Sequence, residues 1–455
     1  SPAVVDDAQF RSLPASIANA RAYRAQALAD MPGTVAHARR ALELLPEDDY
    51  YERGTTAALL GLAYWASGEL EAAYRSFADG LNNLQRGGGI LIRLGGSLIL
   101  AHIAMAQSRL HEAERTYKQA LQLATAHDGP VLQGTAELYL GLAELHHQRG
   151  DLATARQHVQ HGKALGEHAS LPGYEYLWCL VEALITEAEG DLERALDLLS
   201  QAERLFYRSP IPDMRPIEAL KARVLAAHGR LPEALDWVRD RSLSLHDDPS
   251  YLHEYEHITL AQVLIACYRR DQDDRVIREV VDLLERLLQA AEVRQRNGSR
   301  IEILVQLSLA HAAQGDIRAA LVPLERALRL AEPQSYARIF VDHGAAMAHL
   351  LREAAARRIT PDYTARLLAL CAVDADTSQP QPVAAASASP LAEPLSQRER
   401  EILRLLETEL SGPGIADALM IGLSTVRTYT KSIYRKLNVN SRRAAVKRAS
   451  ELDLL

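Results

Sequence analysis

A short motif recurs along most of this chain at intervals of about 40 residues. In its full form the motif consists of a small residue, a polar residue, Leu or Ile, two further residues and Ala, and helical patterns flank it on both sides. The clearest copies begin at Gly68, Gly150, Gly190, Gly229 and Gly315, and weaker ones begin at Ala29, Ser108 and Arg270. Consecutive copies begin 39, 40, 42, 40, 39, 41 and 45 residues apart. This periodicity predicts a protein built from stacked repeats.

The motif has the composition of a turn between two helices. The Gly suits the left-handed residue that ends the first helix, the Leu or Ile packs into the turn, and the Ala lets the paired helices approach closely. One such hairpin cannot bury its apolar face alone, so neighbouring pairs must stack into a superhelix with a continuous core. We therefore predict an all-α fold in which residues 1–332 form an α-solenoid. The arrangement resembles tetratricopeptide repeats, although its period exceeds the roughly 34 residues of that family.

The periodicity ends before two further segments. Residues 333–371 break the repeat, and we predict that short helices at 343–357 and 361–371 cap the last apolar face of the stack. Residues 372–394 are rich in Ala, Ser and Pro and contain few large apolar side chains. Because a segment of this composition cannot bury enough surface to order itself, we predict a flexible linker there.

Charge is divided unevenly between the two ends of the chain. Residues 391–455 carry 11 Arg/Lys and 8 Asp/Glu, whereas the remaining residues carry 40 and 51. An acidic body with a small basic end is typical of a nucleic-acid-binding module attached to a larger domain. The first residues lack a signal-peptide pattern, no apolar run is long enough for a bilayer, and the three cysteines are far apart. We therefore expect a cytoplasmic protein that does not interact with a membrane.

The basic end contains an amphipathic helix, predicted at residues 422–437. One side carries a stripe at helical spacing, formed by Val426, Thr430, Ile433 and Leu437. The other side carries cations and hydrogen-bonding groups, namely Arg427, Thr428, Lys431, Tyr434 and Arg435. The first side can pack against other helices while the second faces the major groove of DNA, whose width suits one helix.

Three further short helices surround the amphipathic one. Ser396 and Glu399 have the spacing of a capping box at the start of the first, Ser411 can cap the second, and Ser441 can cap the fourth, which runs to about Glu451. Four short helices with a basic, amphipathic third helix match a helix-turn-helix module at residues 395–455.

This terminal region also carries a set of residues that resembles a known family. The set comprises Leu395 to Leu403, Ile415, Ala416, Leu419, Ile421, Thr425, Val426, Thr428, Lys436, Leu437, Val439, Arg442, Ala445, Val446, Glu451 and Leu452. Residues 395–455 thereby resemble the LuxR/GerE-type DNA-binding domain. The resemblance implies DNA-base contacts from Arg427, Thr428 and Lys431, a phosphate contact from Thr425, and a dimerisation role for the fourth helix. As further candidate phosphate contacts we name Tyr434, Arg435, Arg442, Arg443 and Lys447.

The combination of long helical repeats with this end resembles the large ATP-dependent LuxR regulators of the MalT-like group. In that group a nucleotide-binding module precedes repeats that take part in sensing an inducer. This chain has no G-x-x-x-x-G-K-[ST] phosphate loop and opens in repeat-like sequence without Met. We therefore expect no cofactor in this chain. Either a module that binds ATP lies upstream of Ser1, which we favour because the chain begins within the pattern, or the protein never had one. The expected partners are double-stranded DNA, a small-molecule inducer or regulatory protein on the repeats, further copies of the chain, and RNA polymerase if the protein is an activator.

Other chemistry has weaker support in the sequence. His253, Glu254 and His257 match the H-E-x-x-H pattern of zinc proteases, but no third ligand follows at a suitable spacing. A metal patch could be formed by His146, His147, His158 and His161, but solvated helix residues are the simpler explanation. An inducer groove could be lined by aromatic residues, which more often fill the core between helices; these are Tyr64, Trp65, Tyr139, Tyr176, Trp178 and Trp237. We expect no catalytic, cofactor or metal site. The alternative to a DNA-binding regulator is a protein-binding scaffold with an incidental basic end.

Overall fold

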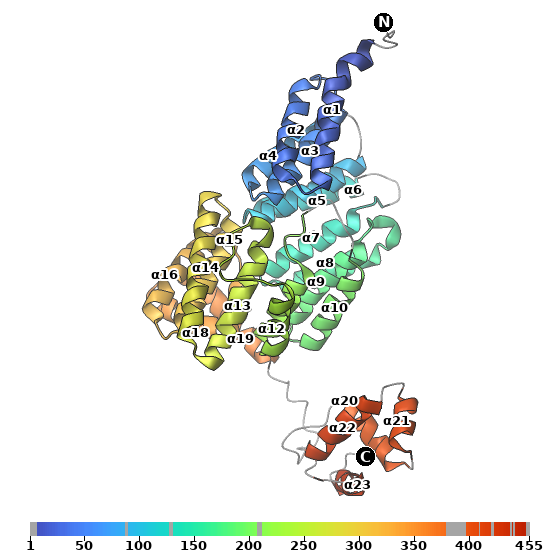
Figure 1. The fold of residues 1–455 in the computed structure, drawn as a ribbon, viewed down its shortest axis with the longest axis vertical. Coiled ribbons are helices and arrows are strands. Elements are labelled where there is room, and N and C mark those ends of the chain that lie inside the picture. Colours follow the sequence, from blue (N-terminus) through green and yellow to red (C-terminus); the bar gives the residue numbers. More distant parts are fainter. Residues whose placement is uncertain are drawn as a thin grey trace. The chain divides into compact units, whose positions relative to one another are not determined.

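The computed structural model describes residues 7–86, 90–126, 131–206, 212–378, 397–408, 410–419, 423–436, 439 and 442–451. These residues are helical or lie in turns between helices, and none of them forms a strand (Figure 1). The predicted all-α class is therefore confirmed. The chain divides into two compact units, residues 1–379 and 380–455. Within the described ranges, no helix is long and apolar enough to cross a bilayer.

The first unit is built from helix pairs, each joined by a tight turn. The pairs are α1 (Asp7–Ala27) with α2 (Met31–Leu44), α3 (Tyr50–Ala66) with α4 (Leu70–Arg86), α5 (Ile90–Ala106) with α6 (Leu110–Thr125), α7 (Thr135–Gln148) with α8 (Leu152–Ala164), α9 (Tyr174–Ala188) with α10 (Leu192–Arg204), α11 (Ile217–Ala227) with α12 (Leu231–Asp240), α13 (Glu254–Asp271) with α14 (Asp274–Val293), and α15 (Asn297–Ala313) with α16 (Ile317–Ala331). The predicted solenoid of helical hairpins is confirmed.

The turns have the left-handed conformation that the sequence motif predicts. The left-handed residues are Ala29, Ser108, Gly68, Gly150, Gly190, Gly229 and Gly315, all with positive φ. The degraded copy at Arg270 is an exception, because Arg270 lies inside α13 and Gln272 takes the left-handed conformation at φ 55°. The motif Ala is almost completely buried wherever it occurs, at Ala73, Ala113, Ala155, Ala195, Ala234 and Ala320. Close approach of the paired helices is therefore what this position provides.

Five of the second helices begin with an Asp cap. The carboxylates of Asp30, Asp151, Asp191, Asp273 and Asp316 each accept a hydrogen bond from a backbone amide in the first turn of α2, α8, α10, α14 and α16. Such a bond satisfies one of the amides that have no partner inside the helix. In α6 and α12 the corresponding residue is Arg109 or Arg230, and neither side chain makes a cap.

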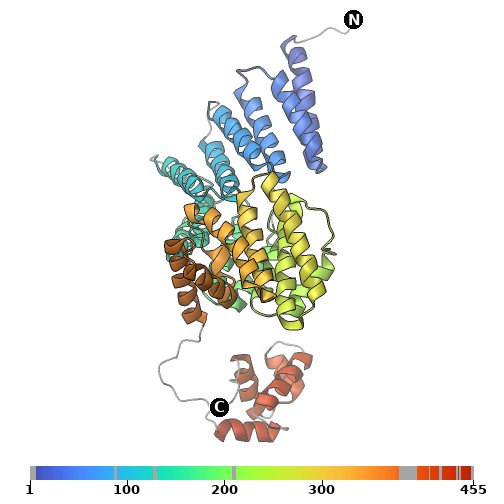
Figure 2. The same ribbon diagram turned by 90° about the vertical axis from the view of Figure 1, so that its left-hand side faces the viewer.

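The solenoid closes on itself, which the sequence did not indicate. A single apolar cluster combines buried residues between Leu94 and Leu145 with others between Ile258 and Leu367. Helix α15 packs against α5, and α17 (Arg338–Val341) packs against α7 (Figure 2). The intervening helices α8 to α12 have smaller clusters of their own. The stacked repeats therefore wind far enough for the last helices to bury part of the apolar surface of α5 to α7.

The end of the first unit agrees with the prediction in part. Helices α18 (Gly344–Ala356) and α19 (Pro361–Ser378) occupy the segments predicted to be helical, and Met347, Leu350 and Leu351 of α18 are buried in the shared core. However, α19 extends to Ser378, so the first residues of the predicted linker at 372–394 are helical. The rest of that segment lies outside the described residues.

The second unit is a small bundle of α20 (Gln397–Glu407), α21 (Gly412–Ala418), α22 (Leu423–Lys436) and α23 (Arg442–Glu451). Its core consists of Ile402, Leu403, Leu406, Ile415, Ala416, Val426, Ile433, Ala445 and Ala449. The hydroxyl of Ser411 accepts from the amide of Gly414 at 3.4 Å, as expected of a cap for α21. Ser396 and Ser441, the other expected caps, lie outside the described residues.

Loss of one repeated cap should have a measurable effect. Asp316→Ala removes the bond of 2.9 Å from the amide of Ala319 and should lower the free energy of unfolding by about 0.5–2 kcal/mol. Urea denaturation followed by circular dichroism measures this change. Arg318→Ala, which alters an exposed residue of the same turn, is the control and should change stability by less than about 0.5 kcal/mol. Equal effects of the two substitutions would contradict the capping role.

Candidate nucleic-acid interface

Helix α22 turns its apolar stripe into the bundle. Val426 and Ile433 are buried in the core of the second unit, and the half-buried Thr430 hydroxyl donates to the carbonyl of Val426 at 2.8 Å. These three residues confirm the predicted inner face, whereas Leu437 lies outside the described residues. On the same helix Lys431 is exposed. One face of α22 is therefore committed to packing, and a predicted base-contacting cation is accessible to solvent.

A buried ion pair joins α22 to α20. The Lys436 ammonium donates to one carboxylate oxygen of Glu399 at 2.9 Å, and the Ser432 hydroxyl donates to the other at 2.7 Å. The side chains of Lys436 and Glu399 are only 11% and 5% exposed. Both partners are satisfied, so the pair holds the C-terminal half of α22 in one orientation on α20. The sequence predicted only a capping role for Glu399 and missed this bridge.

Arg442 binds the end of α20. Its guanidinium donates to the carbonyl oxygens of Leu406 at 2.9 Å, Leu410 at 2.6 Å, Thr408 at 2.6 Å and Leu405 at 3.4 Å. The last carbonyls of a helix have no partner within it, and a cation there also interacts favourably with the helix dipole. Four of the five guanidinium N–H groups are used in these bonds. The structure therefore gives Arg442 a structural role, in contrast to the phosphate contact predicted from its charge.

The other predicted phosphate contacts lie on the same two helices. Tyr434 is half-buried against the core of the second unit, and burial raises the pKa of its phenol although the nearby Arg442 partly lowers it. The backbone of α22 carries Thr425, Arg427, Thr428 and Arg435, and that of α23 carries Arg443 and Lys447. The side chains of these six residues are outside the described part of the molecule. Their roles as base and phosphate contacts stay predictions.

The H-E-x-x-H segment has structural partners in the first unit. The carboxylate of Glu254 is paired with the guanidinium of Arg296, and both side chains are almost fully buried. The two ring nitrogens of His257 lie 2.9 Å from the carbonyl oxygen of His253 and 3.1 Å from a carboxylate oxygen of Asp247. These contacts tie the start of α13 to neighbouring segments. Within the described residues there is no group of three or more potential ligands suited to a metal ion.

The aromatic candidates divide between core and surface positions. Tyr64, Trp65 and Trp237 are 5–9% exposed, so they fill the space between helices, as the sequence favoured. Tyr139 stacks near His158 and His161 at ring-centroid distances of 5.9 and 5.6 Å. Burial, with the positive potential of nearby His146 and His161, lowers the pKa of His158 to about 4. The His158 ring is therefore neutral at pH 7 and lies beside Tyr139.

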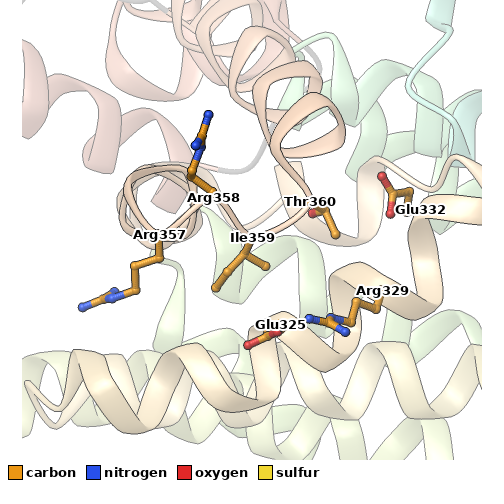
Figure 3. A pocket seen from close by; sticks show the side chains of 7 residues that line it. All are labelled: Glu325, Arg329, Glu332, Arg357, Arg358, Ile359 and Thr360. Carbon is orange, nitrogen blue, oxygen red and sulfur yellow. Dashed lines mark hydrogen bonds and ion pairs between the residues drawn. The ribbon is translucent and has the colours of Figure 1, made fainter.

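A shallow pocket of about 500 Å³ lies beside the end of α16 (Figure 3). Its lining residues are Glu325, Arg329, Glu332, Arg357, Arg358, Ile359 and Thr360. The Arg329 guanidinium is paired with Glu325, and that of Arg357 with Glu353 at 3.4 Å. Because acids partly neutralise these cations and the pocket is open to solvent, we assign it no ligand.

The buried pair provides a test of how α22 is held. Glu399→Gln removes the charge that Lys436 needs in a buried position and should destabilise the second unit by about 3–5 kcal/mol. Hydrogen exchange of α22 amides should accelerate accordingly. The exposed Arg404→Gln on the same helix α20 is the control, and its exchange rates should match those of the parent. A Glu399→Gln protein with unchanged exchange in α22 would show that the pair does not hold this helix.

Comparison with known proteins agrees with this geometry. Residues 15–357 match the family described as the MalT-like TPR region, and residues 393–449 match the luxR family of bacterial regulatory proteins. Relatives include the HTH-type transcriptional regulator MalT of Serratia proteamaculans, 24% identical over 437 residues, and that of Yersinia pestis, 25% identical over 436 residues. These alignments cover 91% and 90% of this chain but 47% and 46% of the relatives, so the chain spans about half their length.

The solved structures that match this chain are more distant in sequence. A Rap protein complexed with Competence and Sporulation Factor is 11% identical, with a TM-score of 0.47 over 71% of this chain and 99% of the other. The family assignment rests on the sequence matches, the first of which covers most of the chain. The chain therefore belongs to the family with a MalT-like TPR region, followed by a C-terminal helix-turn-helix of the luxR family of bacterial transcription regulators.

Proposed function

We propose that the second unit binds specific sites on double-stranded DNA by placing α22 in the major groove. The observation that carries the proposal is the division of α22 into a packed face, with Val426 and Ile433 buried, and an opposite region in which Lys431 is exposed. A groove-binding helix needs this division, because one face must hold its orientation while the other reaches the bases. The Glu399–Lys436 pair supplies the orientation.

Base choice and affinity come from different residues in this proposal. Arg427, Thr428 and Lys431 read base edges, since Arg and Lys pair well with the acceptors of guanine and Thr can bond to several bases. Thr425, Tyr434, Arg435, Arg443 and Lys447 contact phosphates, which sets the register of the protein on the duplex and makes affinity depend on salt. Two copies of the chain would read two half-sites about one helical turn apart.

We assign the first unit the role of controlling the DNA-binding unit. It would bind a small-molecule inducer or a regulatory protein and would contribute to self-association, in the cytoplasm. RNA polymerase would be a partner if the protein is an activator, and ATP would act in a module outside this chain. The relatives' designation as transcriptional regulators supports this assignment. If the basic end binds no duplex, the scaffold alternative is favoured instead.

Substitution of the proposed base-reading residues tests specific binding. A cognate duplex can be selected from a random library with the parent chain, and its affinity measured by fluorescence anisotropy. Lys431→Ala and Arg427→Ala should each weaken binding by about 1–3 kcal/mol while the circular dichroism spectrum stays unchanged. Arg404→Ala, an exposed cation on α20, is the control and should keep the parent affinity. Equal affinity of all four proteins would refute the assignment of α22.

Two neighbouring arginines of α23 should behave differently. Arg443→Ala should reduce the slope of log affinity against log salt by about 1, as expected for loss of one phosphate contact. Arg442→Ala should instead lower the melting temperature of the second unit, because it leaves the carbonyls at the end of α20 without donors. Differential scanning calorimetry and salt titrations separate the two effects. A stable Arg442→Ala protein with a reduced slope would reverse the two assignments.

A further inference from the structure

A short segment after α16 joins distant parts of the first unit. We call Pro333–Ala337 the strap. The backbone amide of His111 donates to the side-chain oxygen of Gln334 at 3.1 Å, and the His111 ring Nε2 lies 3.1 Å from the carbonyl oxygen of Pro333. The Tyr336 hydroxyl donates to the carbonyl of Met105 at 3.5 Å. The strap therefore reaches the end of α5 and the start of α6, more than 200 residues earlier in the chain.

The strap supplies caps that these helices lack locally. The residue before α6 is Arg109, whose side chain makes no cap, so the amide of His111 is satisfied by Gln334. At the end of α7, the carbonyl of Gln148 accepts from the amide of Ala337 at 2.8 Å. The next carbonyl, that of Arg149, accepts a hydrogen bond from the Arg366 guanidinium of α19 at 2.8 Å. In α2, α8, α10, α14 and α16 the corresponding N-terminal cap comes from an Asp directly before the helix.

Close packing at one turn accompanies these caps. A Cβ added at Gly150 would lie 3.1 Å from the Cβ of Ala337 and 3.0 Å from a methyl carbon of Leu370 in α19. The turn glycines Gly229 and Gly315 have nearly the same left-handed φ, yet a Cβ there would meet no atom within 4 Å. The repeat turn after α7 is therefore a docking point, while these two other copies of the same turn are open.

The strap is also packed against the last helices of the first unit. The Tyr363 hydroxyl of α19 donates to the carbonyl of Tyr336 at 2.5 Å, and the Tyr363 ring meets Phe340 of α17 edge to face at 6.2 Å between ring centroids. Any displacement of the strap therefore displaces α17 and α19 with it. Helix α19 is the last element of the first unit before the chain continues to the second.

We propose that the strap is a releasable clasp. When closed, it holds α17 and α19 against the end of α7 and caps α6 and α7. When open, it frees α17 and α19 and changes the constraint on the segment that leads to the DNA-binding unit. The exposed hydrogen bonds that join His111 to Gln334 and Pro333 suit such a device, because water can replace them when the clasp opens. An effector shifts this equilibrium only if it binds one state better than the other. The regulatory half of this inference rests on the proposed DNA-binding function.

A wedge and a cap deletion test the clasp in the whole chain. Gly150→Asn places a side chain against Ala337 and Leu370, and Asn tolerates the left-handed conformation. Gln334→Ala removes the cap of α6. Gly229→Asn is the matched control, since it has the same conformation without a neighbour. Hydrogen exchange measured by mass spectrometry should be at least tenfold faster at 338–378 in both test variants and unchanged there in the control. Protection of α9 and α10 should stay at the parent level in all three.

A DNA-binding readout tests regulation separately. The probe is a duplex selected from a random library by the parent chain. Both test variants should change affinity for it at least threefold relative to Gly229→Asn. Unchanged exchange at 338–378, or equally accelerated exchange throughout the first unit, would overturn the clasp. If exchange at 338–378 is accelerated but the test variants bind the duplex with the same affinity as Gly229→Asn, the regulatory role of the clasp is overturned. If the parent selects no duplex, the proposed function fails, whereas the exchange experiment still decides the clasp.

Discussion

The first unit depends on the close contact of two helices at the motif Ala. Ala73, Ala113 and Ala155 are completely buried where the second helix of a pair crosses the first. A larger side chain there would push the helices apart, and well-packed interiors tolerate such additions poorly. Because each pair stacks on the one before, a change in one pair would alter the position of all the pairs that follow. The small residue therefore sets the geometry of the whole superhelix.

The closure of the superhelix follows from this accumulated geometry. An open solenoid has contacts only between neighbouring repeats, and its stability is close to a sum of local terms. Here α13 to α19 share a core with α5 to α7, and the strap caps α6 and α7, which lie far earlier in the chain. The two ends of this arc consequently stabilise each other.

The second unit shows that charge alone does not identify a DNA contact. Lys436 of α22 and Arg442 of α23 are both basic. Lys436 is paired with the buried Glu399, whereas Arg442 caps the end of α20. Lys431 is exposed on the same α22. The division follows from orientation, since cations that face the bundle are needed to satisfy buried acceptors. Those on the outer face remain available for phosphates and bases.

The sequence by itself determined the features that depend on residues close together in the chain. Helical hairpins, left-handed turns and the amphipathic α22 all follow from spacings of a few residues, so they could be predicted. Only the tertiary structure decided which distant residues meet. Four contacts join segments more than 30 residues apart. They are the closure by the strap, the bridge from Glu399 to α22, the pairing of Glu254 with Arg296 and the cap that Arg442 provides. Their partners are selected by the path of the folded backbone, which local spacing does not encode.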